Sequence, residues 1–554
     1  MTSQSAPDPP GRSTQPDESA GHRSMAKTWM GLGFGPLLAL LIFWLGSPQS
    51  PVIDPGNLLS PEARATAAIG GLMAVWWMTE AVPLPVTSLL PIVLFPLAGV
   101  LTVESATAPY ASKFVFLFLG GFLVARAVER WNLHRRIALL TVFAAGTDPR
   151  RLIAGFMVAT GLISMWISNT AATVMMLPIG LSLVRLLQPR LNLAGGTVRD
   201  GKHFASAMML GIAYAASIGG TATLVGTPTN LFLAGFAADR GITIGFGRWM
   251  LFATPLSAAL LFSAWFLLSC VVLPIRMTQS LGGRDLILDE LRKLGRLSRG
   301  EMIAAVVFIA TALLWIFREP LTESAWLVAR LPALSQLDDT VIAMLAAISL
   351  FFIPVDWRRG TFALDWDTAA TIPWGVLLLF GGGFSLAHAV SESGLAEWLG
   401  SHIAYLSDAP SWLLVLVVTT MLVFLTEMTS NTPTVAAFMP ILHVVALQLK
   451  IDPLLLMVPA TISASMAFML PVATPPNAIV FGSGYVTIGE MARSGFALNL
   501  ASIVLIVSWT MLVDVSWLSH TDQHPNKNER AGATVSPNAK SPSATQNGPH
   551  SGGS

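Results

Sequence analysis

The segment Met165-Trp166-Ile167-Ser168-Asn169-Thr170-Ala171-Ala172 places three consecutive polar residues inside an apolar stretch. Polar groups at membrane depth cost free energy unless they find hydrogen-bonding partners. Ser, Asn and Thr are poor residues for a helix interior but good residues for a helix N-cap. The segment therefore predicts a break in a membrane helix at 168–170, with a new half-helix beginning just after it.

A second triplet, Ser430-Asn431-Thr432, interrupts another apolar stretch in the later half of the chain. Pro433 follows it directly, and proline is accepted in the first turn of a helix while it restricts the residue before it. An alternative is that the hydroxyls bond back to the main chain inside ordinary helices. Two identical triplets at equivalent positions favour two breaks over this alternative.

The two triplets belong to an internal repeat. They lie 262 residues apart (168 to 430), and the segments 118–122 and 380–384, both rich in Gly and Phe, share this separation. A third pair, Gly226-Thr-Pro-Thr-Asn230 and Ala473-Thr-Pro-Pro-Asn477, lies 247 residues apart (226 to 473). Such repeats are typical of secondary transporters, which bind substrate near the membrane midplane where two halves meet. We expect the repeats to be inverted.

The composition is that of a membrane protein. Of the 554 residues, 53% are hydrophobic and 11% are charged, whereas soluble domains average about 25% charged residues. Apolar stretches long enough to span a bilayer recur, and about ten to twelve candidate spans can be counted. The formal net charge of +1 gives no overall basic field for nucleic acid. The single cysteine excludes an intrachain disulfide.

Polarity and charge divide the chain into five segments. Residues 1–28 and 519–554 are rich in Pro, Ser and Gly, which predicts disordered tails. Residues 29–275 and 300–518 are two membrane halves, each with one copy of the repeat. The basic loop 276–299 joins them. By the positive-inside rule this loop and the first tail face the cytoplasm.

Fixed positive charge is absent from the apolar stretches around the triplets, since no Lys or Arg occurs in 152–184, 203–239, 411–449 or 453–492. A bound anion would then be held by helix N-termini and neutral donors. Backbone carbonyls freed at the breaks could coordinate cations that supply the missing charge. Anion and cation would bind interdependently, which is the thermodynamic basis of symport.

Two longer motifs accompany the triplets: Ser-Ile-Gly-Gly-Thr-x-Thr-x-x-Gly-Thr-Pro-x-Asn at 217–230 and Leu-Pro-Val-Ala-Thr-Pro-Pro-Asn at 470–477. With them, residues 60–515 resemble the divalent anion/sodium symporter family, which contains sodium-coupled dicarboxylate and citrate carriers. The resemblance implies an all-α polytopic membrane protein with inverted repeats and about 11 transmembrane helices. It also implies two re-entrant hairpins near 113–130 and 373–399, scaffold and transport domains, elevator-type transport, and a homodimer in the plasma membrane.

The resemblance also carries site residues onto this chain. The implied substrate-binding residues are Ser168, Asn169, Thr170, Ser430, Asn431, Thr432, Thr474 and Pro475. The implied first sodium site consists of Ser164, Ser168, Asn169 and Gly226. The implied second sodium site consists of Thr426, Thr429, Asn431 and Ala473.

We therefore expect a secondary active transporter and not an enzyme. It would couple Na⁺, with no organic cofactor, to di- and tricarboxylates such as succinate, malate, fumarate and citrate. Its partners would be this substrate, the bilayer and a second copy of the chain, with no nucleic acid. Both triplets end in Thr, which favours a carboxylate substrate.

Other functions remain open at this point. The same fold could carry sulfate, exchange dicarboxylates without sodium, or couple to protons through Glu80 or Glu427, which lie near apolar runs. A membrane enzyme is the alternative of another class. The sequence offers it no metal cluster, acid pair or nucleophile–base pair.

Overall fold

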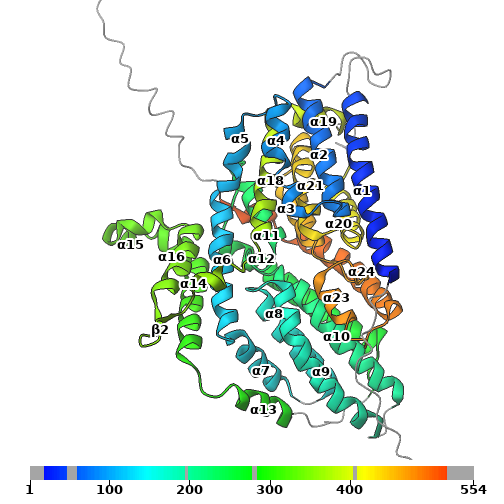
Figure 1. Ribbon diagram of the computed structural model, residues 1–554, viewed down its shortest axis with the longest axis vertical. Coiled ribbons are helices and arrows are strands. Elements are labelled where there is room, and N and C mark those ends of the chain that lie inside the picture. Colours follow the sequence, from blue (N-terminus) through cyan, green and yellow to red (C-terminus); the bar gives the residue numbers. More distant parts are fainter. Residues whose placement is uncertain are drawn as a thin grey trace, which may run out of the picture.

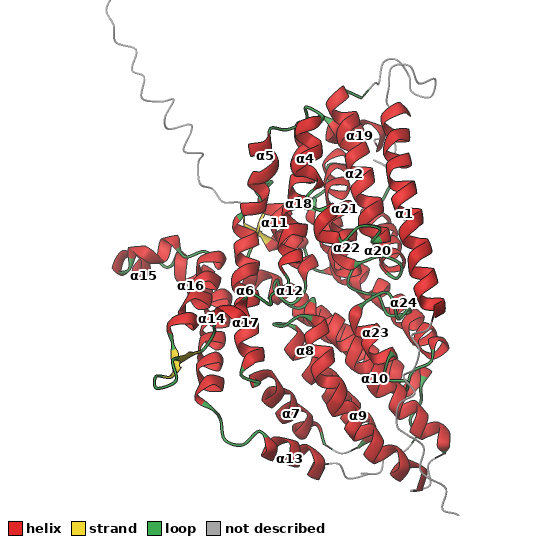
Figure 2. Ribbon diagram, in the orientation of Figure 1, coloured by secondary structure: helices red, strands yellow, loops and turns green. Residues whose placement is uncertain are grey.

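The computed structural model describes residues 18–45, 59–146, 148–193, 197–276, 284–403 and 409–520, and these form an elongated bundle of helices (Figure 1). Figure 2 shows how little of the described chain is strand. The disorder predicted for the two tails falls mainly on residues 1–17 and 521–554, which lie outside the described residues.

The helices of the first half are α1 Glu18–Leu45, α2 Pro61–Thr79, α3 Leu84–Thr87, α4 Leu90–Leu97, α5 Val103–Thr107, α6 Lys113–Arg130, α7 Leu133–Ala145, α8 Pro149–Ser164, α9 Asn169–Leu193, α10 Val198–Gly220, α11 Pro228–Ala238 and α12 Phe246–Phe266. Those of the second half are α13 Arg284–Lys293, α14 Arg299–Glu323, α15 Ala325–Arg330, α16 Asp339–Phe352, α17 Trp366–Ala369, α18 Trp374–Glu392, α19 Leu395–Ile403, α20 Ser411–Thr426, α21 Asn431–Gln448, α22 Leu454–Ser463, α23 Pro475–Phe481 and α24 Ile488–Leu512.

Four short strands form two antiparallel pairs. β1 (Thr243–Ile244) pairs with β4 (Ser519–His520), and β2 (Pro354–Asp356) pairs with β3 (Thr361–Phe362). The first pair fixes the end of the described chain beside the start of α12. An all-α architecture was predicted, and these pairs are the minor exception to it in the described residues.

The internal repeat of the sequence is present in the helices. α8 ends at Ser164 and α20 ends at Thr426, two positions 262 residues apart. α9 and α21 then begin at Asn169 and Asn431, which have the same separation. α11 and α23 each begin at a proline, a residue preorganised for the first helical turn. The helix breaks predicted at the two triplets are therefore confirmed.

The first triplet lies at the tip of a helical hairpin. α8 runs in the same direction as α10, as two close contacts establish: Met157 with Gly211, and Gly161 with Gly219. α9 runs back along α10, from Asn169 beside Gly220 to Gly180 beside Ile212. α8 and α9 are therefore antiparallel, and residues 165–168 turn the chain between them.

The second triplet is arranged in the same way. α20 ends beside the end of α22, because Thr426 donates a hydrogen bond to the carbonyl oxygen of Ala464. α21 starts at this end, and its other end joins the start of α22 through residues 449–453. α20 and α21 are therefore also antiparallel.

The hairpins expected near 113–130 and 373–399 differ from those observed. Residues 113–130 form a single helix, α6, and the second range contains α18 followed by a turn at Gly394 into α19. The glycines of these segments allow close packing instead of a reversal. A Cβ on Gly120 would lie 2.7 Å from Ala343, and one on Gly382 would lie 2.3 Å from the carbonyl oxygen of Ser88. The reversals occur at the triplets.

Seven helical stretches of the described residues are long and apolar enough to cross a membrane, and four shorter apolar helices accompany them. The ten to twelve spans counted in the sequence did not distinguish helices long enough to cross the membrane from the shorter apolar helices. Two segments contain helices that the sequence did not predict. α1 begins at Glu18, within the polar tail assigned to 1–28, and the basic loop 276–299 contains α13.

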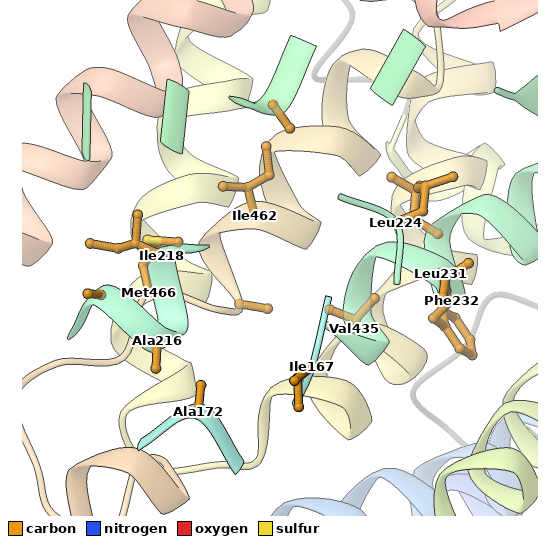
Figure 3. Packing of buried hydrophobic residues seen from close by; sticks show 14 of the residues in the cluster. Ile167, Ala172, Ala216, Ile218, Leu224, Leu231, Phe232, Val435, Ile462 and Met466 are labelled. Atoms are coloured by element: carbon orange, nitrogen blue, oxygen red, sulfur yellow. The ribbon is translucent and has the colours of Figure 1, made fainter. Parts of the chain in front are cut away.

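Buried side chains join the two halves into one core. Phe118 of α6 stacks on Phe380 of α18 with ring centroids 4.1 Å apart, and Phe232 of α11 stacks on Phe384 at 5.0 Å. Figure 3 shows Ile167 and Val435, which lie close to the first and the second triplet, in this same cluster. The core therefore brings the two hairpin tips into one region.

Candidate functional site

A cavity of about 470 Å³ lies where the two hairpin tips meet. All of the predicted substrate-binding residues line it, and so do Gly226 and Ala473 from the predicted sodium sites. Thr227 and Pro228 line it as well, although the sequence analysis did not assign them to the site. Another hollow of about 450 Å³, between α8 and α12, is lined almost entirely by apolar side chains and offers few groups to a charged ligand.

Helix N-termini surround this cavity. α9, α21 and α11 begin at Asn169, Asn431 and Pro228, all of which line it, and the short α23 begins there at Pro475. The first-turn N–H groups of a helix lack partners within the helix and carry partial positive charge. Several such ends directed at one cavity provide an anion site without a fixed cation.

A cluster of three oxygen atoms lies behind the first triplet. Ser164 Oγ is 2.8 Å from Asn169 Oδ1 and 2.6 Å from the carbonyl oxygen of Ala216. The single hydroxyl hydrogen of Ser164 cannot serve both acceptors at once. The cluster therefore has an excess of acceptors over donors, which is the environment that a hard cation such as Na⁺ requires.

Main-chain oxygens extend this first cluster toward Gly226. A Cβ on Gly226 would lie 2.4 Å from the carbonyl oxygen of Gly220 and 2.9 Å from that of Met165. A Cβ on Gly220 would lie 2.4 Å from Asn169 Oδ1. These atoms come together because neither glycine carries a side chain. The geometry agrees with the prediction that Ser164, Asn169 and Gly226 share a site.

The second triplet has an equivalent cluster. Thr426 Oγ1 is 2.8 Å from Asn431 Oδ1 and 2.7 Å from the carbonyl oxygen of Ala464. Thr429, which was predicted to join this site, behaves differently. Its hydroxyl bonds to the carbonyl oxygen of Leu425 and to Thr434, and no bond to the Thr426–Asn431 pair is present.

Both oxygen clusters consist of neutral groups. In the described part of the chain, no group of three or more His, Cys, Asp or Glu side chains could hold a metal ion. A transition metal or a tightly bound divalent ion usually requires such ligands. Hydroxyl, amide and carbonyl oxygens suit a monovalent cation that must bind and leave.

Two equivalent asparagines hold the loops that precede α11 and α23. Asn230 Nδ2 donates to the carbonyl oxygens of Thr221 and Thr223 at 3.0 and 2.7 Å. Asn477 Nδ2 donates to the carbonyl oxygens of Ala467 and Leu470 at 3.0 and 3.1 Å. Both side chains are buried. Asn230 closes the connection 221–227 between α10 and α11, and Asn477 closes the longer connection 464–474 between α22 and α23. In the sequence, these asparagines appear only as the last residues of the two paired motifs.

The two loops are supported differently near the hairpin tips. In the first half, Gly226 N donates to Thr223 Oγ1 at 3.0 Å, and that hydroxyl donates to the carbonyl oxygen of Met165. In the second half, the position equivalent to Met165 is Glu427, a buried carboxylate.

Glu427 accepts hydrogen bonds from the loop after α22. Its oxygens accept from the backbone N–H groups of Phe468 (2.7 Å), Met469 (2.9 and 3.0 Å) and Leu470 (3.2 Å), and from Asn499 Nδ2 at 2.7 Å. All of these hydrogen bonds are accepted by Glu427, so its carboxyl group supports the loop. Glu80, the other proton-carrier candidate, is exposed at the end of α2.

One basic side chain contradicts the expectation of a cavity wall without fixed positive charge. Arg126, from α6, lines the cavity together with Glu129 and Thr371. It forms an ion pair with Glu129, so the pair adds no net charge. Arg126 lies outside the stretches that contain the triplets and the loop motifs, so the lack of Lys and Arg in those stretches gave no sign of it. The contact with Thr371 joins residues 245 apart in the chain.

Known proteins similar to this chain are membrane transporters. A family model described as the sodium:sulfate symporter transmembrane region matches residues 35–518. The sodium-dependent dicarboxylate transporter SdcS of Staphylococcus saprophyticus is 42% identical over 481 residues, which cover 86% of this chain and 90% of that protein. SdcS of a Staphylococcus aureus strain is 42% identical over 480 residues, which cover 86% and 89%.

Two solved transporter structures share the fold at low identity. The YdaH transporter of Alcanivorax borkumensis has a TM-score of 0.50 and 15% identity, with 88% of this chain and 98% of that chain covered. MtrF of Neisseria gonorrhoeae has a TM-score of 0.50 and 16% identity, with 75% and 84% covered. At these identities the likeness concerns the fold alone.

Proposed function

We propose that this chain, a multi-pass membrane protein of the sodium:sulfate symporter family, is a sodium-coupled symporter of dicarboxylate anions. The observation that carries the proposal is one cavity bordered by two oxygen clusters and several helix N-termini. Curated relatives that are 42% identical to it over about 480 residues are named sodium-dependent dicarboxylate transporters.

Coupling between anion and cation follows from two shared residues. Asn169 and Asn431 each contribute Oδ1 to an oxygen cluster and also line the cavity. A sodium ion that attracts Oδ1 orients the amide, so that the Nδ2 hydrogens can face a carboxylate in the cavity. The positive ion also lowers the cost of placing a dianion there. Each ligand therefore raises the affinity for the other.

A dicarboxylate fits the cavity better than sulfate does. The two triplets provide two sets of donors, one on each hairpin tip, and a four-carbon dicarboxylate has one carboxylate for each set. The cavity of about 470 Å³ has room for such a substrate or for a tricarboxylate. Sulfate is compact, and it would engage one set of donors more easily than both.

Alternating access would occur by an elevator-type movement in a homodimer. α8–α12 and α20–α24 would form the mobile transport domain, and α6, α14, α16 and α18 would belong to the scaffold. Contacts between the two groups include aromatic rings on glycines, as where Phe384 packs on Gly235 and Phe232 on Gly383. They also include the ion pair between Arg248 of α12 and Glu319 of α14, which a sliding movement would have to break.

Proton coupling has less support than sodium coupling. All of the hydrogen bonds described for Glu427 are accepted ones that support a loop, and Glu80 does not line the cavity. Sodium-independent exchange is also disfavoured, because the two oxygen clusters would then have no ligand. Membership of a transporter family is the reason to regard the chain as a carrier and not as an enzyme.

The direct test is uptake of labelled succinate into proteoliposomes. We expect uptake that requires an inward sodium gradient and falls to the level of protein-free liposomes when choline replaces sodium. Competition by unlabelled succinate, citrate, α-ketoglutarate and sulfate then ranks the substrates. Equal uptake in sodium and choline would reject the sodium coupling, and competition by sulfate alone would reject the dicarboxylate.

A further inference from the structure

Arg126 occupies a position that sodium–dicarboxylate symport does not by itself require. It projects from α6 into the wall of the triplet cavity, and its side chain is 33% exposed. The neighbouring Glu129, one helical turn later, is 18% exposed and pairs with it. Among the described residues that line this cavity, Arg126 is the only Lys or Arg. A permanent cation facing an anion site affects binding unless something neutralises it.

The contacts of Arg126 leave part of its guanidinium available. Nε donates to Thr371 Oγ1 at 3.1 Å, one terminal nitrogen donates to the same oxygen, and the other donates to Glu129. A guanidinium has five N–H donors, so the described contacts use one donor on each nitrogen. One N–H remains on each terminal nitrogen, which is the fork that binds a carboxylate.

A second cavity extends from the first at this point. It has a volume of about 410 Å³, and Asn132 and His134 line it without lining the first cavity. The residues that line both cavities are Arg126, Glu129, Ser168, Thr170 and Ala171. The ion pair therefore lies at the junction between the triplet site and a second cavity at the start of α7. α7 contacts the basic segment through Arg135 and Glu290 of α13, and this segment is predicted to be cytoplasmic.

We propose that Arg126 is a specificity-determining residue that binds a carboxylate of the substrate as the anion passes between the two cavities. Glu129 holds the guanidinium and partly neutralises it, and the substrate carboxylate binds the N–H groups that remain. Because Glu129 keeps its ion pair, the passing anion is bound weakly and can be released. The proposal rests on the proposed anion transport and adds a preference: anions with a further carboxylate, such as citrate, gain more from Arg126 than succinate does.

The test compares transport kinetics of single variants in proteoliposomes. Arg126→Leu is expected to raise the KM for citrate by about fivefold and that for succinate by less, as the loss of one partly exposed ion pair implies. Glu129→Gln is expected to change the KM in the opposite direction, because Arg126 is then free. Added choline chloride should reduce the difference between Arg126→Leu and the unaltered protein, since salt screens exposed charges.

Two control variants separate substrate binding from support of the fold. Thr371→Val removes the hydrogen bonds that tie Arg126 to the segment before α18. Arg130→Leu removes the next arginine of α6, which pairs with Asp365 and does not line either cavity. We expect neither to reproduce the citrate-selective rise in KM. The proposal would be overturned if Thr371→Val showed the same citrate-selective rise in KM as Arg126→Leu. It would also be overturned if Arg126→Leu left the ratio of the KM values for citrate and succinate unchanged.

The unaltered protein separates this proposal from the proposed function. If it shows no sodium-dependent dicarboxylate uptake, the proposed function fails by itself. Thermal stabilisation by sulfate, succinate and citrate then tests Arg126 alone, because its charge acts on any anion in the cavity. Stabilisation that is equal in the unaltered protein and in Arg126→Leu, for all three anions, would reject the role of Arg126.

Discussion

Replacing Glu427 by glutamine removes one negative charge from the support of the loop before α23. The carboxylate accepts hydrogen bonds from three consecutive backbone N–H groups, those of residues 468–470, and from Asn499. Glutamine keeps one oxygen, which can serve Phe468 and Asn499. Its amide nitrogen then faces the N–H of Leu470, where the wild-type oxygen lies at 3.2 Å.

The magnitude follows from these contacts. An unpaired buried donor costs about 1–3 kcal/mol, and each remaining bond loses the extra strength of a charged acceptor. The loop is therefore destabilised by about 3 kcal/mol. This loop begins at Ala464, whose carbonyl oxygen belongs to the second oxygen cluster. If the whole loss acted on ion binding, sodium affinity would fall about 100-fold. We expect about tenfold, since part of the loss falls on overall stability.

The assay is the sodium dependence of succinate uptake, together with thermal unfolding of the purified protein. Glu427→Gln should raise the sodium concentration for half-maximal uptake about tenfold and lower the Tm. Glu80→Gln is the matched control, because Glu80 is exposed at the end of α2, and it should change neither quantity. A Glu427→Gln variant with unaltered sodium dependence and Tm would refute the role of the carboxylate. A changed pH profile with unaltered sodium dependence would favour a proton carrier.

Asn169→Ala and Asn431→Ala should each reduce succinate uptake to background while the protein still inserts and purifies normally, because each amide serves an oxygen cluster and the cavity; near-normal uptake by either would contradict the site assignment. Gly226→Ala should weaken sodium binding severely, since its Cβ would lie 2.4 Å from a backbone oxygen, whereas Ala473→Gly at the equivalent position should have little effect on sodium titrations. Asp365 caps α17, and hydrogen bonds from Thr368 and Arg130 lower the pKa of its carboxyl. Its stabilising contribution is therefore present above the ordinary pKa of Asp and is lost as the pH falls through the lowered value, so Asp365→Asn should flatten the acid side of a plot of Tm against pH.

The sequence predicted the parts of the site that are local. A polar triplet inside an apolar stretch breaks a helix wherever it occurs, and its repetition after 262 residues marks the second break. The hydrogen bonds of Asn230 and Asn477 are local too, since they stay within ten residues, although the sequence predicted no role for these two side chains. Interactions between residues this close in the sequence can be inferred without the tertiary structure.

The remaining parts depend on contacts between distant residues. Glu427 reaches a loop 41–43 residues away and Asn499 72 residues away, and Arg126 meets Thr371 across 245 residues. The hairpins were misplaced for a related reason. Glycine-rich segments such as 118–122 resemble turns in the sequence, but their glycines accommodate neighbouring backbone inside straight helices.

The unequal support of the two loops has a consequence for the order of ion loading. Thr223 holds the first loop through one neutral hydroxyl, whereas Glu427 holds the second through several charged bonds and also brings a negative charge next to Thr426. We therefore expect the second pocket to be held more firmly and to attract a cation more strongly, and the first pocket to depend more on its ion for order. We therefore expect the two sodium ions to bind in sequence, the one at the second pocket first. The substrate would then meet a carrier that already holds one ion.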